Sequence, residues 1–307
     1  ENRLSELWSI FDFLMPGLLG TRESFAKRFE SPVEHAEGDS AARLQALVSP
    51  FVLRRVKEDV VADLPEKIED TVMAQLTGEQ RKLYLANQDR IAQQVQHREA
   101  SEFKKDKLKV LAELTKLRQI CCDPRLHYED YKAGSAKLDT CMELVHGALD
   151  GGHRILLFSQ FTGMLDIIGK RLAREDIAFL KLTGASSKES RAKMVAQFQA
   201  GEVPVFLISL KAGGVGLNLT AADVVIHYDP WWNVAAQDQA TDRAHRIGQQ
   251  HTVTVCKLIA KDTIEERIMQ MQESKRDLVN SVLGGDGISS ALFTREDVLA
   301  LLGGDGR

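Results

Sequence analysis

Arg243 and Arg246 are the residues of this chain whose type and spacing most favour phosphate chemistry. They end a run that is rich in alanine and free of proline and glycine, which predicts a helix over residues 233–246. Side chains three positions apart share one face of a helix, and a guanidinium group is a planar donor that suits phosphate oxygens. The alternative is a solvated helix face, or salt bridges to Asp238 and Asp242.

The elements that must position this pair alternate between strands and helices after residue 134. Short apolar runs predict buried strands over residues 154–160, 177–184, 203–209, 223–229 and 252–259. The stretches between them predict helices over residues 136–149, 162–174, 187–200, 233–246 and 262–279. This alternation predicts an α/β fold, a parallel sheet with helices on both faces, in which ligands bind at the carboxyl ends of the strands.

Four successive predicted strands end in small, polar, basic or aromatic residues. These residues are Ser159 and Gln160, Thr183 and Gly184, Ser209 and Lys211, and the run from Asp229 to Asn233 that contains Trp231 and Trp232. A single end of this kind is an ordinary turn, and each tryptophan alone is as well explained by core packing. Four such ends at one sheet edge indicate a binding face, and tryptophans near arginines are typical of nucleic-acid grooves.

The loop after the third strand, from Lys211 to Gly216, contains three glycines in four positions. Glycines let a backbone approach a polyanion closely, although a tight strand-to-helix turn explains the same pattern. The phosphate loop G-x-x-x-x-G-K-[ST] occurs nowhere in the 307 residues, and no Asp-Glu pair follows an apolar strand. A complete nucleotide site is therefore not predicted from this sequence.

Bulk composition narrows the class of protein. The formal net charge is −4, so nucleic-acid binding must come from local patches. Four cysteines without a C-x-x-C pair argue against a zinc site, no metal ligand is assigned, and free thiols suit a reducing compartment. Apolar runs are too short to span a bilayer, and the first residues lack the features of a signal peptide. We expect an intracellular protein, with Glu1 lying inside a longer chain.

The first 134 residues read as mostly helical. Predicted helices include one from residue 4 that stops at Pro16, and one that begins after Thr77 with Gln80 completing a capping box. The tail contains one short helix, "REDVLALL". We expect three parts, at 1–134, 135–280 and 281–307.

Three long motifs, in order, closely resemble motifs four to six of the Swi/Snf family of helicase-like, DNA-translocating ATPases. They are "LLFSQF", "LISLKAGGVGLNLTAADVVIHYDPWWN" and "QATDRAHRIGQ". "PFVLRRVKEDVVADLPEK" and "KLRQICCDP" resemble two further blocks of that family. The resemblance covers the chain to about residue 280. It implies the second of two RecA-like lobes, preceded by a mostly helical, family-specific insertion region and the end of the first lobe.

The resemblance also implies roles for individual residues. Arg243 and Arg246 match the catalytic arginines of motif six, and we expect Arg246 to be the principal arginine finger. Gly214, Gly216 and Gln239 match nucleotide-binding positions. Positions on the DNA-facing side are Ser159, Gln160, Thr183, Lys211, Trp231, Trp232, Asn233, Arg54 and Arg55, the last two in a basic block with Lys57 that equally suits bracing of the lobes.

The expected function is that of the C-terminal motor lobe of an ATP-dependent translocase on double-stranded DNA, contacted through its backbone. The full-length protein would use ATP and Mg²⁺ together with a first RecA-like lobe. The 307 residues alone are expected to be inactive, because the phosphate loop and the acidic magnesium motif are absent from them. The alternatives are a DNA- or partner-binding module without catalysis, or a strand-separating helicase. We expect no membrane contact, and location in the nucleoid or the nucleus according to the organism.

Overall fold

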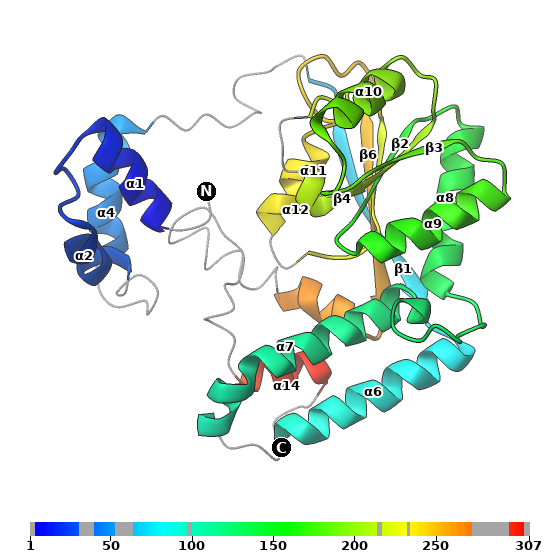
Figure 1. The fold of residues 1–307 in the computed structure, drawn as a ribbon, viewed down its shortest axis with the longest axis horizontal. Coiled ribbons are helices and arrows are strands. Elements are labelled where there is room, and N and C mark those ends of the chain that lie inside the picture. The colour runs from blue at the N-terminus through cyan, green and yellow to red at the C-terminus, as the bar shows by residue number, and fades with distance from the viewer. Residues whose placement is uncertain are drawn as a thin grey trace.

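The sheet at the centre of the molecule has six strands, all parallel to their neighbours. The computed structural model describes residues 4–30, 40–52, 64–96, 100–213, 217–231, 234–271 and 295–303. The strands are β1 (Lys67–Gln75), β2 (Ile155–Ser159), β3 (Phe179–Leu182), β4 (Val205–Ser209), β5 (Val224–His227) and β6 (Val253–Lys261). Their order is β1-β6-β5-β2-β4-β3, with every pairing parallel (Figure 1). The predicted α/β fold with a parallel sheet is confirmed.

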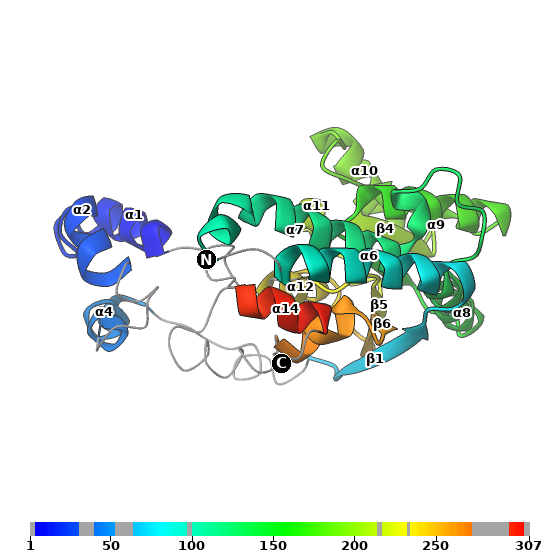
Figure 2. The same ribbon diagram turned by 90° about the horizontal axis from the view of Figure 1, so that it is seen from below.

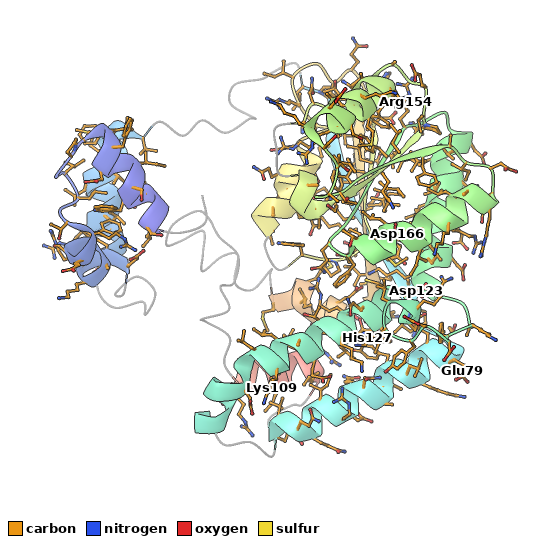
Figure 3. All side chains as sticks on the ribbon, viewed as in Figure 1. Glu79, Lys109, Asp123, His127, Arg154 and Asp166 are labelled. Atoms are coloured by element: carbon orange, nitrogen blue, oxygen red, sulfur yellow. The ribbon has the colours of Figure 1, made fainter. Side chains whose placement is uncertain are left out.

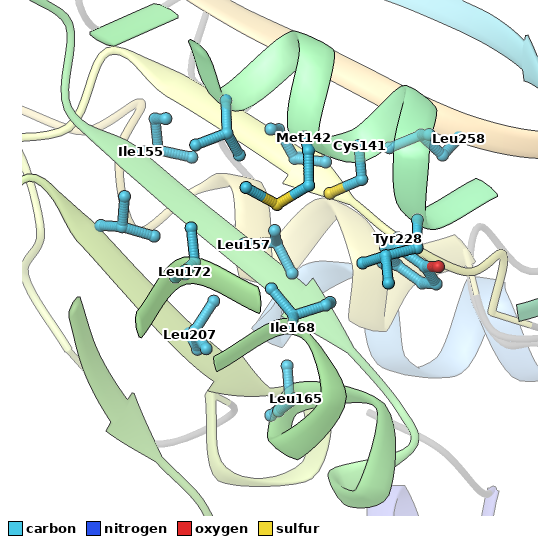
Figure 4. Close-up of a cluster of buried hydrophobic side chains, with 14 of the residues drawn as sticks. Cys141, Met142, Ile155, Leu157, Leu165, Ile168, Leu172, Leu207, Tyr228 and Leu258 are labelled. Atoms are coloured by element: carbon cyan, nitrogen blue, oxygen red, sulfur yellow. The ribbon is translucent and has the colours of Figure 1, made fainter. Parts of the chain in front are cut away.

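Helices cover both faces of this sheet, as predicted. Successive strand residues point to opposite faces, so Ile155 and Leu157 join one core cluster while Leu156 and Phe158 join another. The first cluster lies under α8 (Ala136–Asp150) and α9 (Thr162–Arg174), whose Met142 and Ile168 side chains pack over β2 (Figure 4). The second lies under α10 (Lys188–Gln199), α11 (Leu210–Gly213) and α12 (Val234–Thr241).

A third core cluster joins two helices that precede β2 in the sequence to the last two described helices of the chain. It packs α6 (Gly78–Gln96), α7 (Ala100–Cys122), a helix over residues 264–271 and α14 (Arg295–Leu302), which lies beside α6 (Figure 2). Gln88 Nε2 donates to the Leu302 carbonyl at 2.6 Å, which fixes the end of α14. The short helix predicted in the tail is thus confirmed, and it is anchored to the helical region. Within the described ranges, no helix has the length and apolar character needed to cross a membrane.

The first described residues form a small helical group with its own core. It comprises α1 (Leu4–Leu14), α2 (Arg22–Phe25), η1 (Ala26–Glu30), α4 (Ser40–Val48) and η2 (Ser49–Phe51). Phe11, Phe25 and Leu44 are among its buried side chains. As predicted, α1 ends just before Pro16, because proline cannot donate the backbone hydrogen bond that would continue the helix.

Strand β1 was not predicted. Its residues, Lys67–Gln75, are mostly exposed and carry three acidic or basic side chains, so they lack the apolar run that marks a buried strand. They pair with β6 along nine positions, from Lys67 with Val253 to Gln75 with Lys261. The division of the chain at residue 134 remains a prediction, and β1 joins the sheet from before that boundary.

The predicted capping box at Gln80 is not formed as expected. Gln80 Nε2 donates to the carbonyls of Ile120 and Cys121 at 3.0 and 3.3 Å, and its Oε1 accepts from Ala136 N at 3.1 Å. The amide therefore joins α6 to the end of α7 and the start of α8, because those buried backbone groups need partners more than an exposed helix start does.

Candidate functional site

The carboxyl edge of the sheet is fixed by a buried carboxylate. Ser159 and Ser209 end β2 and β4 in register, and Asp229 follows β5. The hydroxyl of Ser159 donates to Asp229 Oδ2, and Gln160 N donates to Asp229 Oδ1 at 3.1 Å. Burial raises the pKa of Asp229, an effect that nearby Arg118 opposes. The ends of β2 and β5 are therefore tied together, as the prediction of a common edge requires.

Ser159 itself does not face solvent. Its side chain is fully buried, and its hydroxyl is used by Asp229. In this structure Ser159 holds the strand end, and Gln160, half-buried beside it, is the side chain of the pair that reaches the edge.

Arg118, on α7, is a residue of this edge that we did not predict. It is 2% exposed, and it donates from Nη1 to Gln160 Oε1 at 3.2 Å and from Nη2 to the Pro230 carbonyl. Gln160 Nε2 is left buried without a hydrogen-bond partner in the part of the chain that is described. In the sequence Arg118 lies within "KLRQICCDP", a block that resembles the family, but nothing in that block pointed to the sheet edge. Through Arg118, the helical region reaches the carboxyl edge directly.

Three other residues predicted for the carboxyl edge follow the ends of strands, as expected. Thr183 follows β3, half-buried, and its carbonyl accepts from Ser186 N at 3.1 Å in a turn. Trp231 follows β5 and packs partly against the second core cluster, which supports the core-packing interpretation of this side chain. Lys211 lies in α11 directly after β4.

Several predicted site residues lie outside the described ranges. They are Arg54, Arg55, Lys57, Gly214, Gly216, Trp232 and Asn233. Gln239 is described, and it is exposed on α12.

The predicted helix over 233–246 is wrong at its end. α12 stops at Thr241, and residues 242–248, which we call the arginine turn, continue as a series of turns before β6. Arg243 is only 7% exposed, whereas Arg246 is exposed, so the two side chains do not share one helix face. Tertiary hydrogen bonds end the helix, because the carbonyl of Arg243 accepts from Leu219 N at 2.9 Å.

The Arg243 guanidinium is buried but incompletely partnered. Its Nε has no hydrogen-bond partner among the residues that the structure describes. Burial lowers the pKa of Arg243, and the positive charge of Arg246 adds to this effect, while the carboxylate of Asp242 opposes it. A buried Nε without a partner, close to a second cation, fits an anionic oxygen ligand.

Two further contacts shape the arginine turn. His245 Nε2 lies 2.8 Å from the carbonyl oxygen of Pro65, which links the turn to the start of β1. Gly248 has φ +102°, a conformation that glycine adopts readily and other residues rarely do. The turn is thus held in one backbone path at both ends.

The described residues contain no group of three His, Cys, Asp or Glu side chains that could hold a metal ion. Four cysteines, at 121, 122, 141 and 256, are buried free thiols.

Most of this chain matches known protein families. Residues 1–126 match the family described as SNF2-related domain, and residues 136–248 match the family described as Helicase conserved C-terminal domain. A curated relative, an "Uncharacterized ATP-dependent helicase" of Mycoplasma pneumoniae, is 40% identical over 303 residues. The alignment covers 98% of this chain and 28% of that protein, so this chain spans about a quarter of its relative's length.

Two solved structures from Sulfolobus solfataricus have a similar fold. The SWI2/SNF2 ATPase core in complex with dsDNA is 36% identical with a TM-score of 0.65, covering 98% of this chain and 64% of that one. The SWI2/SNF2 ATPase C-terminal domain is 32% identical with a TM-score of 0.63, covering 77% of this chain and 98% of that one. Both similarities support the α/β fold described above.

Proposed function

This chain belongs to the Swi/Snf (SNF2) family of helicase-like proteins, and we propose that it is the second, C-terminal RecA-like motor lobe of an ATP-dependent translocase on double-stranded DNA. The observation that carries the proposal is the arginine turn. It presents Arg246 to solvent beside Arg243, whose buried Nε has no partner in the described part of the chain. Such a pair is suited to the terminal phosphates of ATP.

In the proposed mechanism the two arginines act only when the lobes close. Arg246 then reaches the transferring phosphate and stabilises the charge that develops on its oxygens. Arg243 holds an adjacent phosphate oxygen from its buried position. Gln239, Gly214 and Gly216 remain proposed contacts of the nucleotide. Because a donor set held in place before reaction needs no rearrangement, a rigid turn favours catalysis.

The carboxyl edge is the proposed DNA-binding surface. Gln160, Thr183 and Lys211 follow three different strands and would contact phosphates, with Trp231, Trp232, Asn233, Arg54 and Arg55 as further proposed contacts. Backbone contacts carry no sequence information and release counterions, so binding is expected to weaken steeply as salt rises. The similar ATPase core from Sulfolobus solfataricus was solved in complex with dsDNA, which supports this choice of ligand.

The rest of the ATP site is proposed to come from a first RecA-like lobe. The 307 residues contain no G-x-x-x-x-G-K-[ST] loop, whose backbone and lysine would cradle the phosphates. Mg²⁺ would be held mainly by that lobe, where it would neutralise phosphate charge. We propose that the present chain supplies the arginines and one of the two lobes that bind DNA.

The test is Arg246→Ala in the full-length protein. We expect DNA-stimulated ATP hydrolysis to fall by about 10³-fold or more, the range associated with arginine fingers, while affinity for duplex DNA changes little. The measurements are steady-state phosphate release with saturating DNA, and fluorescence anisotropy with a labelled duplex.

Arg174→Ala is the matched control, since Arg174 is an exposed arginine at the end of α9, away from the arginine turn. It should leave turnover unchanged. Normal turnover in Arg246→Ala would rule out Arg246 as the principal finger. An equal loss of DNA affinity and turnover would instead place Arg246 at the DNA.

A further inference from the structure

Gln249, the residue just after the arginine turn, is the most extensively hydrogen-bonded side chain near the proposed site. It is 6% exposed. Its Nε2 donates to the carbonyls of Thr220, Ala222 and Ala244 at 3.2, 2.8 and 3.1 Å. Its Oε1 accepts from the backbone N–H groups of Gln250 and His251 at 2.8 and 2.9 Å. One amide thus joins three segments of backbone.

These bonds fasten the arginine turn from the inside. Ala244 lies between the two arginines, and its carbonyl is bound by the Gln249 amide. The carbonyl of Arg246 accepts from Gln249 N at 2.9 Å, and that of Arg243 accepts from Leu219 N at 2.9 Å. The backbone around both arginines is therefore tied to the loop of residues 217–223, which leads into β5. That loop is itself held at the sheet, because Asp223 Oδ1 accepts from the backbone N–H of Arg154, labelled at the upper edge in Figure 3.

Only a primary amide meets the demands of this position. The site presents three carbonyl oxygens on one side and two backbone N–H groups on the other. A carboxylate would satisfy the N–H groups but place negative charge against carbonyl oxygens, and a leucine would leave both sets without partners.

A second glutamine makes it possible to distinguish a positioning role for Gln249 from a purely structural role. Gln199, on α10, holds the same loop through its Oε1, which accepts from Ala221 N at 2.9 Å, and its Nε2, which donates to Thr220 Oγ1 at 3.4 Å. Within the described ranges, its side chain makes no hydrogen bond to the arginine turn. Gln199 and Gln249 therefore both anchor the loop, but only Gln249 extends the anchor to the arginines.

We propose that Gln249 is a positioning residue for ATP hydrolysis, which acts by fixing the backbone that carries Arg243 and Arg246. The inference rests on the proposed function, because it assigns Gln249 a role through the arginine finger. A displacement of about 1 Å in a group that contacts the reacting phosphate can cost about 10²-fold in rate. Loss of the Gln249 amide should therefore lower kcat while the KM for ATP and the affinity for DNA stay close to normal.

The experiment uses the full-length protein with Gln249→Leu, Gln249→Asn and Gln199→Leu. For Gln249→Leu we expect kcat to fall by about 10- to 100-fold, with KM and DNA affinity within about twofold of wild type. Gln249→Asn, whose amide is one carbon shorter, should also lose kcat, and it replaces the leucine variant if that variant does not fold. Gln199→Leu should keep kcat within about threefold of wild type. Unchanged kcat in both Gln249 variants, or an equal loss in Gln199→Leu, would overturn the proposal.

A coupling measurement shows whether the effect passes through the arginine. Gln249→Leu is combined with Arg246→Lys, which keeps the charge but loses the planar fork. If Gln249 acts through Arg246, the double variant should be little slower than Arg246→Lys alone, whereas independent roles multiply. Multiplied losses overturn the positioning role while leaving the finger intact. Normal turnover in Arg246→Ala would instead overturn the proposed function, and the role of Gln249 with it.

Discussion

At the scale of single residues, neighbours in sequence have different environments. Arg243 and Arg246 are three positions apart, yet one is 7% exposed and the other is exposed. Ser159 is fully buried while Gln160 beside it is half-buried. The type of each residue was sufficient to nominate it for phosphate or DNA chemistry. Which side chain reaches a ligand and which one holds the backbone depends on neighbours far away in sequence, such as Leu219 and Asp229.

His227 gives a pH prediction at this scale. It lies on β5, 1% exposed, with Nε2 2.8 Å from Thr241 Oγ1 and its ring stacked on Phe158. Burial, and then the charge of Lys257, lower its pKa to about 3, although Glu69 opposes them. An unfolded chain binds a proton at this imidazole below about pH 6.5, and the folded chain does not until about pH 3. The free energy of unfolding should therefore fall as pH decreases from about 7 to about 5.

The measurement is urea unfolding at about pH 7 and about pH 5 for wild type and His227→Gln, whose amide can still meet Thr241. The variant should lose less stability than wild type across that interval, because glutamine does not titrate. Equal losses in the two proteins would show that His227 does not contribute to the pH dependence.

At the scale of elements, prediction was correct where the pattern of buried apolar residues decides whether a segment forms a strand or a helix. The strands β2 to β6 were predicted because their apolar runs are local, as were α8, α9 and α10 from their spacing. β1 was missed because the strand state of Lys67–Gln75 comes from pairing with β6, more than 180 residues later, and not from its own composition. α12 was predicted too long because its alanines favour a helix, whereas Leu219 and Gln249 bind the carbonyls beyond Thr241.

A buried ion pair joins the elements below the carboxyl edge. Lys137 of α8 and Glu265 of the helix over 264–271 are both fully buried, with Nζ and Oε2 2.5 Å apart. Burial opposes the charge on Lys137, but Glu265 holds its pKa above the usual value. Lys137→Met should lower the free energy of unfolding by about 3–5 kcal/mol, because it leaves an unpaired buried carboxylate.

Urea unfolding of the 307 residues measures this effect. The double variant Lys137→Met with Glu265→Gln should recover most of the loss, since the charge is gone and the glutamine oxygen can still accept from Ala260 N. Lys82→Met, which removes the exposed pair with Glu79, is the matched control and should change little. No recovery in the double variant would contradict this account of the ion pair.

At the scale of the whole molecule, three core clusters meet around one sheet. The loop of residues 217–223, the carboxyl edge and the arginine turn all rest on it, while α6, α7 and α14 reach it through contacts such as Arg118 with Gln160. In Figure 3, Asp123 lies at the end of α7, and Arg154 directly precedes β2, at the opposite end of that strand from Ser159. Movement of α7 relative to the sheet would break the hydrogen bonds of Arg118 to Gln160 and Pro230 at the proposed DNA surface.

The whole-molecule prediction concerns movement along duplex DNA. We expect the full-length protein with ATP to displace a third strand from a triplex without separating the strands of a plain duplex. Displacement of the third strand and strand separation are each measured by gel electrophoresis of labelled strands. The 307 residues alone serve as the control and should show neither displacement nor DNA-dependent ATP hydrolysis, because they lack a phosphate loop. Efficient strand separation would favour the helicase alternative, and turnover by the 307 residues would contradict an incomplete site.

The sequence by itself determined the parallel α/β class, the family and the residues that merit study, because apolar runs and motifs are local properties of the chain. Tertiary structure alone decided the pairing of β1 with β6, the end of α12 at Thr241, and the different exposure of Arg243 and Arg246. It also revealed Arg118 and Gln249, whose side chains bind backbone groups up to 112 positions away. Buried carbonyls and amides must find partners wherever the fold brings them together. Which polar side chain supplies those partners is therefore decided by contacts across the fold, beyond the reach of local patterns.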